Sequence, residues 1–382
     1  MAAPATHLAR RMPLRRITAP PPSRAPSGQR HRLCYTATMR PLPLGLFGFA
    51  AASPLALLAL GLGLGGVWPW LALAYMALAA VSLDLLIPWV AADAPEQEFP
   101  AADALLAALG LACLAALPLM TWAIAGPSGL TLPARIALFV AAGLWFGQVG
   151  HPAAHELIHR PRPLYWLGLA IYTALLFGHH TSAHRLVHHR HVATPQDPNS
   201  APGDESFYRF LRRAAVGSFV AGWRAENALR GPNGKGPHPY VLYVGGGVAA
   251  LILAALIAGL PGVLVWAGLG LHAGSQILLS DYVQHYGLTR ATMADGRPAP
   301  VSVAQSWNTP HWFSQGLMLN APRHSDHHAH PTRPFPALRL PPEAPMLPWP
   351  LPLAALIALF PRLWRRRMRP LLDRRATPPA RE

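Results

Sequence analysis

Six long apolar runs are the strongest constraint on how this chain folds. Crossing the hydrocarbon core of a bilayer takes about 20 apolar residues in a helix, and such a helix satisfies its own backbone hydrogen bonds. Each run meets this length and is bounded by Gly, Pro or charged residues that end helices. The runs cover residues 43–65, 69–91, 103–126, 134–155, 239–260 and 262–284. The sequence therefore predicts an all-α integral membrane protein with about six transmembrane helices.

The composition and the charge distribution agree with this class and suggest an orientation. Hydrophobic residues make up 52% of the 382 residues and charged residues only 13%, which is typical of membrane proteins. Lys and Arg (32) exceed Asp and Glu (16), giving a net charge of +16, and the basic residues gather at the two ends and in the polar segments, as is typical of cytoplasmic segments. Six crossings return the chain to the side on which it began, so we expect both termini in the cytoplasm. We expect no nucleic-acid partner, because no basic patch is interleaved with aromatic residues.

Residues 1–38 differ from the rest of the chain. They are basic and Pro-rich and contain no long apolar run, so we expect a disordered tail in front of a membrane domain that covers residues 39–382. A signal peptide would need an apolar centre and a cleavage site of small residues, which this segment lacks. Met39 is an equally good start for the protein. Cys34 and Cys113 form neither a disulfide framework nor a Cys-x-x-Cys metal site.

Two further apolar runs are too short to cross the bilayer. A crossing at residues 163–178 would place the histidines after this run on the opposite side from the histidines before it. We therefore predict a re-entrant or interfacial helix for this run. Residues 351–360 precede a strongly basic segment, which predicts a surface helix with snorkelling arginines.

Small and polar residues inside the spans also carry expectations. The glycines of residues 245–247, together with Gly268 and Gly270, predict close packing of helices. Asp84 is an ionisable group within the second span, where a functional or paired role is the rule. For His272 we favour a hydrogen bond to a neighbouring carbonyl over a place in a channel.

Histidines are concentrated in one stretch of the chain. All 19 except His7 and His31 lie between His151 and His330, and most occur at short spacings. Neutral imidazole is the commonest protein ligand for iron, zinc, copper and nickel, so such clusters indicate metal binding. The candidate ligands form four sets, which are His155 and His159, then His184, His188 and His189, then His285, and last His324, His327 and His328. Three neighbours are interpreted as non-ligating, namely His179, His180 and His191.

The number of candidate ligands predicts two metal ions. Residues four apart on a helix lie on the same face, so His155 and His159 can bind one ion together. His285 stands alone in the sequence, but the last two spans deliver it to the same membrane face as the other sets. Nine imidazoles are too many for one ion, whereas about four to six ligands for each of two ions leave positions for oxygen or substrate. Iron suits oxygen activation, so we expect a non-haem diiron site with no catalytic residue beyond the ligands.

Two other classes of protein remain open at this point. H-E-L-I-H at residues 155–159 also matches the zinc-protease signature, with Glu156 as the base. Such a protease needs about three protein ligands and would leave the other histidine sets without a role. A metal transporter would place its ligands near the middle of the bilayer, whereas these sets lie at the ends of the spans.

Four histidine motifs resemble those of a known family. The first, H-E-L-I-H-R at residues 155–160, is similar to the pattern H-E-L-x-H-K, and the second is A-H-R-L-V-H-H-R-H-V-A-T-P-Q-D-P from Ala183 onward. The third is D-Y-V-Q-H-Y-G at residues 281–287, and the last is R-H-S-D-H-H-A at residues 323–329. In these motifs the chain resembles the integral-membrane non-haem diiron alkane hydroxylases (alkane 1-monooxygenases), which are relatives of the membrane fatty-acid desaturases.

The resemblance extends over residues 41–368 and implies a site and a reaction. It implies six helices around an apolar channel beneath a histidine-lined diiron centre, on the cytoplasmic side of a bacterial inner (plasma) membrane. It also implies O2-dependent hydroxylation of medium-chain n-alkanes or alkyl chains to primary alcohols, with electrons from rubredoxin or a ferredoxin-type protein and its reductase. Departures from the motifs at Ala183, Asp281 and Gln284 concern groups that orient ligand imidazoles. The alternative in the same superfamily is a membrane fatty-acid desaturase or an alkyl-aromatic hydroxylase.

Overall fold

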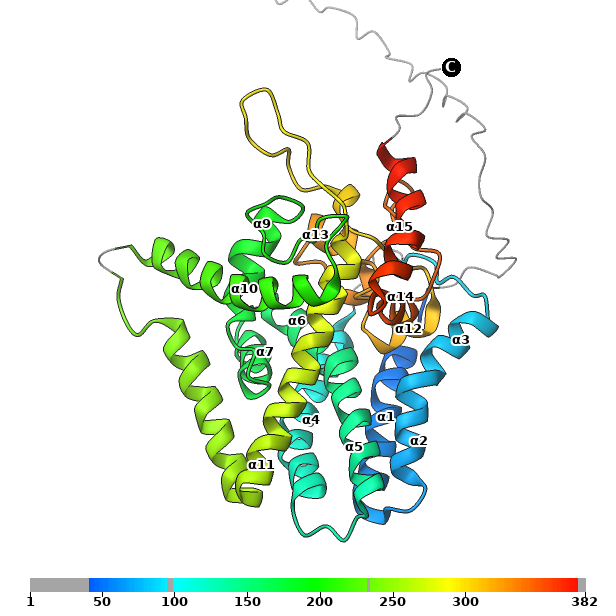
Figure 1. Ribbon diagram of the computed structural model, residues 1–382, viewed down its shortest axis with the longest axis vertical. Helices are drawn as coiled ribbons and strands as arrows, with labels where there is room; N and C mark the ends of the chain where they lie inside the picture. The colour runs from blue at the N-terminus through cyan, green and yellow to red at the C-terminus, as the bar shows by residue number, and fades with distance from the viewer. Residues whose placement is uncertain (1–40, 95–98, 232–233, 377–382) are drawn as a thin grey trace, which may run out of the picture. The chain divides into compact units, whose positions relative to one another are not determined.

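Long apolar helices form the membrane-spanning part of the protein (Figure 1). The structure is a computed structural model that describes residues 41–94, 99–231 and 234–376, and within these residues it contains helices and no β-strand. Five helical segments are long and apolar enough to cross a membrane. They are Leu44–Leu64 (α1), Trp68–Leu86 (α2 Trp68–Ala74, η1 Tyr75–Ala79 and α3 Ala80–Leu86), Pro100–Ala125 (α4), Leu132–Ile158 (α5 Leu132–Trp145, η2 Phe146–Gly150 and α6 His151–Ile158) and Pro239–His285 (α11). The tail predicted at residues 1–38 lies outside the described residues.

All six predicted apolar runs lie in these five segments. α11 contains two of the runs, because its helix is broken at Ala258 and Gly259, where the backbone leaves helical geometry and Gly259 has a φ of 60°. Glycine adopts such a positive φ without steric cost, and the two arms of α11 turn back on each other there (Figure 1). The second run was predicted to extend to residue 91, but the helical segment ends at Leu86. Ile87 has the extended backbone that a following proline favours, and the helix stops before it.

The run at residues 163–178 forms a short helix beside the spans, and the chain reverses its direction after this helix. α7 (Leu164–Ala174) has 11 residues, fewer than a crossing takes. It packs tightly on α6 at Gly168, where an added Cβ would lie 2.8 Å from the carbonyl oxygen of Ala154. The chain turns back at Leu176, which has a φ of 60°, and continues through α8 (His180–Ser182), η3 (Ala183–His188) and α9 (His189–His191). The histidines of these elements therefore return to the end of α6 from which α7 departs.

The remaining helices lie toward one end of the spans, in the upper part of Figure 1. They are α10 (Phe207–Arg230), η4 (Val303–Gln305), α12 (Trp312–Leu317), α13 (His324–Ala329), η5 (Phe335–Ala337), α14 (Leu351–Ala358) and α15 (Pro361–Ala376). Asp84 attaches α12 to the second span, because its buried carboxylate accepts hydrogen bonds from the backbone N–H groups of Phe313 (2.7 Å) and Ser314 (3.1 Å). A carboxylate at this position caps the helix and complements its dipole. Asp84 thus has a paired, structural role.

α14 differs from the surface helix that the sequence predicted. Leu351, Ala354 and Ala358 are buried on one of its faces, while Leu356 and Phe360 are exposed. The helix packs against α11, α15 and α3. Its alanines allow this close approach, so α14 is a half-buried element of the fold and not a helix that only lies on its surface.

Two buried tryptophans join spans to neighbouring elements. The indole N–H of Trp145 in α5 donates a hydrogen bond to the carbonyl oxygen of Ala51 in α1 (3.0 Å), and that of Trp266 in α11 donates to Ala174 at the end of α7 (2.8 Å). Each ring thus buries a large apolar surface and still satisfies its single donor. α4 packs against each of α1, α5, α7 and α11, so the buried apolar core lies around α4.

Glycines in α11 allow close packing at some positions and not at others. A Cβ added at Gly270 would lie 2.7 Å from the carbonyl oxygen of Leu175, and one at Gly246 would lie 2.5 Å from Cγ2 of Thr173. These distances are too short for any side chain, which confirms the predicted role for both glycines. At Gly245, by contrast, an added Cβ would meet no atom within 4 Å. The prediction of close packing is wrong for Gly245, which faces an open space.

Candidate metal centre

Nine histidines from distant parts of the chain form two groups at the same end of the spans. In each group, one ring nitrogen of every histidine lies within 4.8 Å of those of all the others. The first histidine group consists of His155, His159, His184, His189 and His327, and the second histidine group consists of His188, His285, His324 and His328. The sequence predicted all nine as candidate ligands. The structure adds which of them face a common point.

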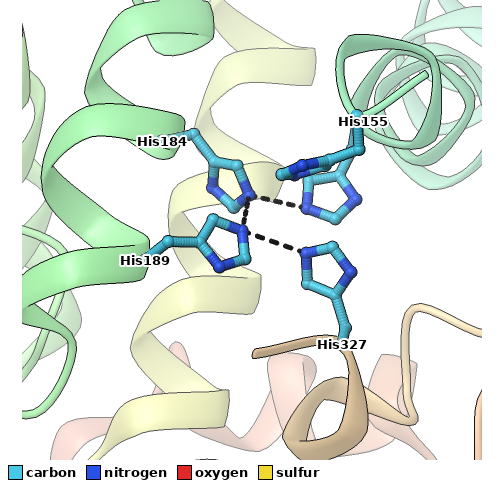
Figure 2. A group of neighbouring side chains, drawn as sticks. His155, His184, His189 and His327 are labelled. Carbon is cyan, nitrogen blue, oxygen red and sulfur yellow. Dashed lines mark hydrogen bonds between the residues drawn. The ribbon is translucent and has the colours of Figure 1, made fainter. Parts of the chain in front are cut away.

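The first histidine group combines three segments of the chain (Figure 2). The Nε2 atoms of His155 and His189 each lie 2.8 Å from Nε2 of His184, and Nε2 of His327 lies 3.1 Å from Nε2 of His189. His159 follows His155 by one helical turn, the spacing that places both rings on one face. His184 and His189 are five residues apart and meet because η3 is a π-helix, whose wider turn brings such residues to the same side.

The second histidine group joins η3, the end of α11 and α13. Nε2 of His324 lies 3.1 Å from Nε2 of both His285 and His328. The ring of His188 has its centroid 4.8 Å from those of His285 and His328. His285 is fully buried among these rings, so the residue that stands alone in the sequence has three close imidazole neighbours in the fold.

The spacing of the nitrogens fits a cation in each group. Two nitrogens bound to one ion through bonds of about 2.0–2.1 Å lie about 2.9 Å apart when the angle between the bonds is 90°. The observed separations of 2.8 and 3.1 Å are close to this value. A neutral imidazole nitrogen offers one proton or one lone pair, so Nε2 of His184 cannot make an ideal hydrogen bond to two neighbours at once. A metal ion would accept the lone pairs of all the converging nitrogens.

Burial keeps these imidazoles in the form that binds metals. Burial, followed by the charges of neighbouring histidines, lowers the pKa values of the α13 residues His324, His327 and His328 well below the usual value of 6.5. The same causes lower the pKa values of His184 and His189. A histidine must be neutral to donate its lone pair to a metal ion. The protein therefore presents these five rings as neutral ligands at physiological pH.

Two hydrogen bonds orient rings of the second histidine group. Nδ1 of His188 lies 2.8 Å from a carboxylate oxygen of Asp197, and Nδ1 of His285 lies 2.9 Å from the carbonyl oxygen of Gln305. Burial lowers the pKa of His188, but the charge and the hydrogen bond of Asp197 outweigh it and the net shift is upward. Partners of this kind fix the tautomer and raise the basicity of a ligand imidazole. Both contacts leave Nε2 of the ring directed at its group.

No role was predicted from the sequence for the residues that make these two contacts. Asp197 belongs to the V-A-T-P-Q-D-P segment of the second motif, so its place in the motif was a usable signal. Gln305 contributes only its backbone carbonyl to His285, and a backbone contact leaves no trace in the residue type. Sequence reasoning could have found the first residue but not the second.

The motif departures act less directly than the sequence suggested. Asp281 accepts a hydrogen bond from the side chain of Asn199 (2.6 Å), whose backbone N–H in turn donates to Asp197 (3.0 Å). Gln284 donates to the carbonyl oxygen of Ala321 (3.1 Å). Asp281 is thus linked to His188 by hydrogen bonds through two intermediates, and its charge also helps to raise the pKa of His188. Gln284 supports the segment that precedes α13.

Other histidines near the candidate ligands lie outside both groups. They are His179, His180, His191 and His330. His179 lies 3.3 Å from the hydroxyl of Ser218, and His330 lies 3.0 Å from the carboxylate of Asp326. These contacts agree with the interpretation of His179 as non-ligating and give His330 a partner other than a metal.

The contacts of Glu156 are those of a residue with a structural role. Its carboxylate accepts a hydrogen bond from Arg160 at 3.2 Å, and Arg160 also lies 3.3 Å from Asp103. The base of a zinc protease has to face the metal-bound water, whereas this carboxylate is engaged by a guanidinium. Together with the three further histidines around His155 and His159, this arrangement does not support the protease hypothesis.

A cavity of about 400 Å³ reaches both histidine groups. His155 and His184 of the first group and His324 of the second line it, and its other walls come mainly from apolar side chains. These include Met76, Val81, Leu144, Ile277, Leu351 and Leu356. His272 also lines the cavity, and within the described residues its ring makes no hydrogen bond to a carbonyl, so the interpretation favoured from the sequence is wrong. The volume is within the range of about 300–1,000 Å³ that is usual for small-molecule sites.

The fold and the site together define a class of protein. The described residues form apolar helices that are long enough to cross a membrane, and two histidine groups lie at an apolar cavity among them. These features define a helical membrane protein with a candidate histidine-rich metal centre. Comparison with known proteins refines this class, because the family model described as fatty acid desaturase matches residues 130–341, more than half of the chain. The chain belongs to the fatty acid desaturase family.

Individual relatives carry a more specific name. The chain is 32% identical over 271 residues to an alkane 1-monooxygenase of Ectopseudomonas oleovorans, an alignment that covers 63% of this chain and 66% of the relative. It is 31% identical over 252 residues to alkane 1-monooxygenase 2 of Alcanivorax borkumensis, covering 64% of this chain and 66% of the relative. It is also 29% identical over 274 residues to the xylene/toluene monooxygenase hydroxylase component XylM of Pseudomonas putida, covering 66% and 70%. The alignments with the two alkane 1-monooxygenases thus span just under two-thirds of the length of each relative.

Proposed function

We propose that this chain is an alkane 1-monooxygenase, which uses O2 to hydroxylate the terminal carbon of medium-chain n-alkanes or alkyl chains. The observation that carries the proposal is the pair of histidine groups at the end of an apolar cavity. A site that activates oxygen needs redox-active metal with open coordination positions next to an apolar substrate. Relatives that are named alkane 1-monooxygenases support the same reaction.

Two iron ions are the proposed cofactors, one for each histidine group. His155, His159, His184, His189 and His327 would hold one ion, and His188, His285, His324 and His328 would hold the other. When bound, iron supplies the redox chemistry by which O2 is activated and one oxygen atom is inserted into a C–H bond. Asp197 and the carbonyl of Gln305 keep two of the imidazoles in the tautomer that binds through Nε2.

The cavity residues position the alkyl chain and exclude water. Leu144, Ile277 and Leu356 offer apolar contacts to the alkyl chain. His155 of the first histidine group and His324 of the second also line the cavity, so a bound chain can reach both groups. An alkane has no polar handle, so only the shape and length of the cavity select the carbon that reaches the metal centre. Discrimination between neighbouring chain lengths is therefore expected to be soft, at about 1–3 kcal/mol for each methylene.

We propose a small acidic electron donor, rubredoxin or a ferredoxin-type protein, together with its reductase. Arg190 follows the candidate ligand His189 directly and is exposed, and its carbonyl oxygen accepts a hydrogen bond from Arg290 (2.8 Å). Two arginines thus lie together close to the first histidine group. Positive charge there would steer an acidic partner, and the rate of electron transfer would fall as salt is raised. We therefore propose that the metal centre lies on the cytoplasmic side of a bacterial inner membrane. Six crossings would place both termini on the same side.

Hydroxylation of a methyl group on an aromatic ring is the second candidate. The similarity to XylM favours it, and a cavity of about 400 Å³ is large enough for a single aromatic ring by the usual volumes of ligand sites. Both candidates need the same metal centre and electron donor. They differ only in the substrate that the cavity walls accept.

One turnover experiment tests the reaction. Membranes that contain the protein are given rubredoxin, its NADH-dependent reductase and oxygen, with a medium-chain n-alkane, toluene or xylene, or a saturated acyl chain in separate reactions, and the products are identified by gas chromatography. We expect the 1-alkanol, with no product without oxygen or from a His184→Ala variant that lacks a candidate ligand. An alkene or an unsaturated acyl product without alcohol would support a desaturase instead, and a benzylic alcohol as the only product, from toluene or xylene, would support the second candidate.

The metal content tests the cofactor separately. We expect about two iron atoms per chain in the purified protein, because the nine histidines form two groups that can each saturate one ion. Inductively coupled plasma mass spectrometry measures this ratio directly. A single zinc ion with no iron would contradict the diiron proposal.

A further inference from the structure

A second hollow lies outside the cavity of the metal centre and shares no lining residue with it. We call it the arginine groove. It has a volume of about 810 Å³, with Arg162, Arg185 and Trp166 among the residues at its polar part and Val241, Leu242 and Gly245 along the first turns of α11. None of these residues has a role in the proposed reaction.

Two arginines of the groove have a positive charge that forms no ion pair with the acidic residues that the structure describes. Arg162 and Arg185 are exposed and make no ion pair within the described residues. The guanidinium carbon Cζ of Arg162 lies 5.2 Å from the centroid of the Trp166 ring, and Cζ of Arg185 lies 5.1 Å from the centroid of the Tyr165 ring. These cation–π contacts hold both guanidinium groups in place. The groove also contains Arg160, whose charge is paired within the protein.

The one acidic side chain in the groove has a partner elsewhere. Glu226 accepts a hydrogen bond from the buried hydroxyl of Ser182 at 2.5 Å. That hydroxyl also lies 2.8 Å from the hydroxyl of Tyr243. Glu226 is thereby bound into a network with α8 and α11, and Arg162 and Arg185 remain available to an anion from outside.

The opposite part of the groove is apolar and open. Val241 and Leu242 are 62% and 47% exposed, and they belong to the first turn of a helix that is long and apolar enough to cross the membrane. An added Cβ at Gly245 would meet no atom within 4 Å, whereas the neighbouring Gly246 packs on Thr173. A slot therefore runs from the arginines along α11 in the direction of the hydrocarbon.

α10 indicates that the arginine groove lies at the level of the lipid headgroups. Val216, Phe219, Val220 and Trp223 are exposed at spacings that place them on one face of this helix. An exposed apolar stripe beside basic residues is typical of a helix that lies in the membrane interface. The ring of Trp223 has its centroid 4.1 Å from that of His238, which lines the groove. Tryptophan is enriched at this depth of a membrane.

We propose that the arginine groove binds an anionic phospholipid. The phosphate would be held by Arg162 and Arg185, because a guanidinium binds phosphate oxygens in a bidentate manner. One acyl chain would lie along Val241 and Leu242 and over Gly245. Lipid is the occupant that matches both ends of the groove at once, with unpaired cations at headgroup depth and an open apolar slot below them. The proposal does not depend on iron or on the reaction proposed above.

Native mass spectrometry of the purified full-length protein tests this proposal. The protein in detergent is mixed with phosphatidylglycerol or with phosphatidylcholine of the same acyl chains, and the fraction that retains lipid is measured over a concentration series. We expect retention of phosphatidylglycerol in preference to phosphatidylcholine. Each of Arg162→Gln and Arg185→Gln should weaken it about fivefold, the usual effect of one basic residue at an anionic lipid surface.

Two further variants separate groove binding from general attraction. Gly245→Leu should lower retention without disturbing the fold, because the added side chain enters open space. Arg212→Gln removes an exposed arginine of α10 that does not line the groove, and it should leave retention unchanged. Equal retention of the two lipids by the wild-type protein, or equal losses from Arg212→Gln and Arg162→Gln, would overturn the proposal. Undiminished retention in Gly245→Leu would overturn the assigned path of the acyl chain.

Discussion

Replacing Asp197 by Asn is predicted to empty the second histidine group before the first. One carboxylate oxygen of Asp197 lies 2.8 Å from Nδ1 of His188 and 2.7 Å from the hydroxyl of Ser200, and the other accepts the backbone N–H of Asn199 at 3.0 Å. An amide has one oxygen and one NH2 group in place of the two oxygens. In either orientation of the amide, the NH2 group faces at least one N–H or O–H donor, so at least one hydrogen bond is lost.

The size of the effect follows from what Asp197 does for His188. The carboxylate holds a buried imidazole in the tautomer that presents Nε2 to its group, and its negative charge increases the basicity of the ring. Loss of such a partner typically lowers metal affinity about 10–100-fold, which corresponds to about 1.4–2.7 kcal/mol. Because His188 belongs only to the second histidine group, the metal affinity should decrease for only one of the two ions.

A chelator competition measures this difference. Purified protein is equilibrated with increasing concentrations of an iron chelator, and the iron that remains per chain is determined. For the variant we expect half of the iron to leave at a chelator concentration about 10–100-fold lower than for the wild type. Asp295→Asn, at an exposed carboxylate in the loop after α11, is the matched control. Release of both ions at wild-type concentrations would refute the role of Asp197, and simultaneous loss of both would refute the separation into two groups.

Four further predictions concern the ligands, the fold, the topology and the N-terminal tail. His285→Ala should lower the iron content as much as His327→Ala, because both rings lie inside a histidine group, and wild-type iron in the first variant would exclude His285 as a ligand. Asp84→Ala should destabilise the protein by about 1–3 kcal/mol through two buried N–H groups of α12 left without an acceptor, measured as a lower midpoint of thermal unfolding, and an unchanged midpoint would contradict the cap. Reporter fusions at the two ends of the chain should both report the cytoplasm, and opposite sides would mean an odd number of crossings. Deletion of residues 1–38 should leave membrane insertion and activity intact, since a tail without a long apolar run has little with which to pack.

The spans and the identity of the candidate ligands could be predicted because both are local properties of the sequence. A run of apolar residues or a pair of histidines four apart carries its meaning within one or two helical turns. His155 and His159 show this, since a spacing of four on a helix is enough to bring their rings into one group. Even His285, which has no histidine neighbour in the sequence, could be assigned from the face to which its span delivers it.

The division of the histidines between the two groups could not be predicted, because it depends on a change of helical type. In a regular α-helix, His184 would share its face with His188, four residues on. The π-helical geometry of η3 instead brings His184 together with His189 and turns His188 toward the other group. The role of Asp84 is equally non-local, because it joins the second span to backbone N–H groups more than two hundred residues later in the chain.

Neighbouring histidines that face different groups have a consequence for how such chains can evolve. His188 and His189 belong to different groups, and so do His327 and His328. Inserting or deleting one residue in η3 or α13 would exchange one imidazole for the other and leave both groups incomplete. Selection should therefore act on the number of residues between the histidines as strictly as on the histidines themselves. We expect homologous chains to exchange side chains freely within these two segments and to place their gaps in exposed connections, such as residues 289–302 between α11 and η4.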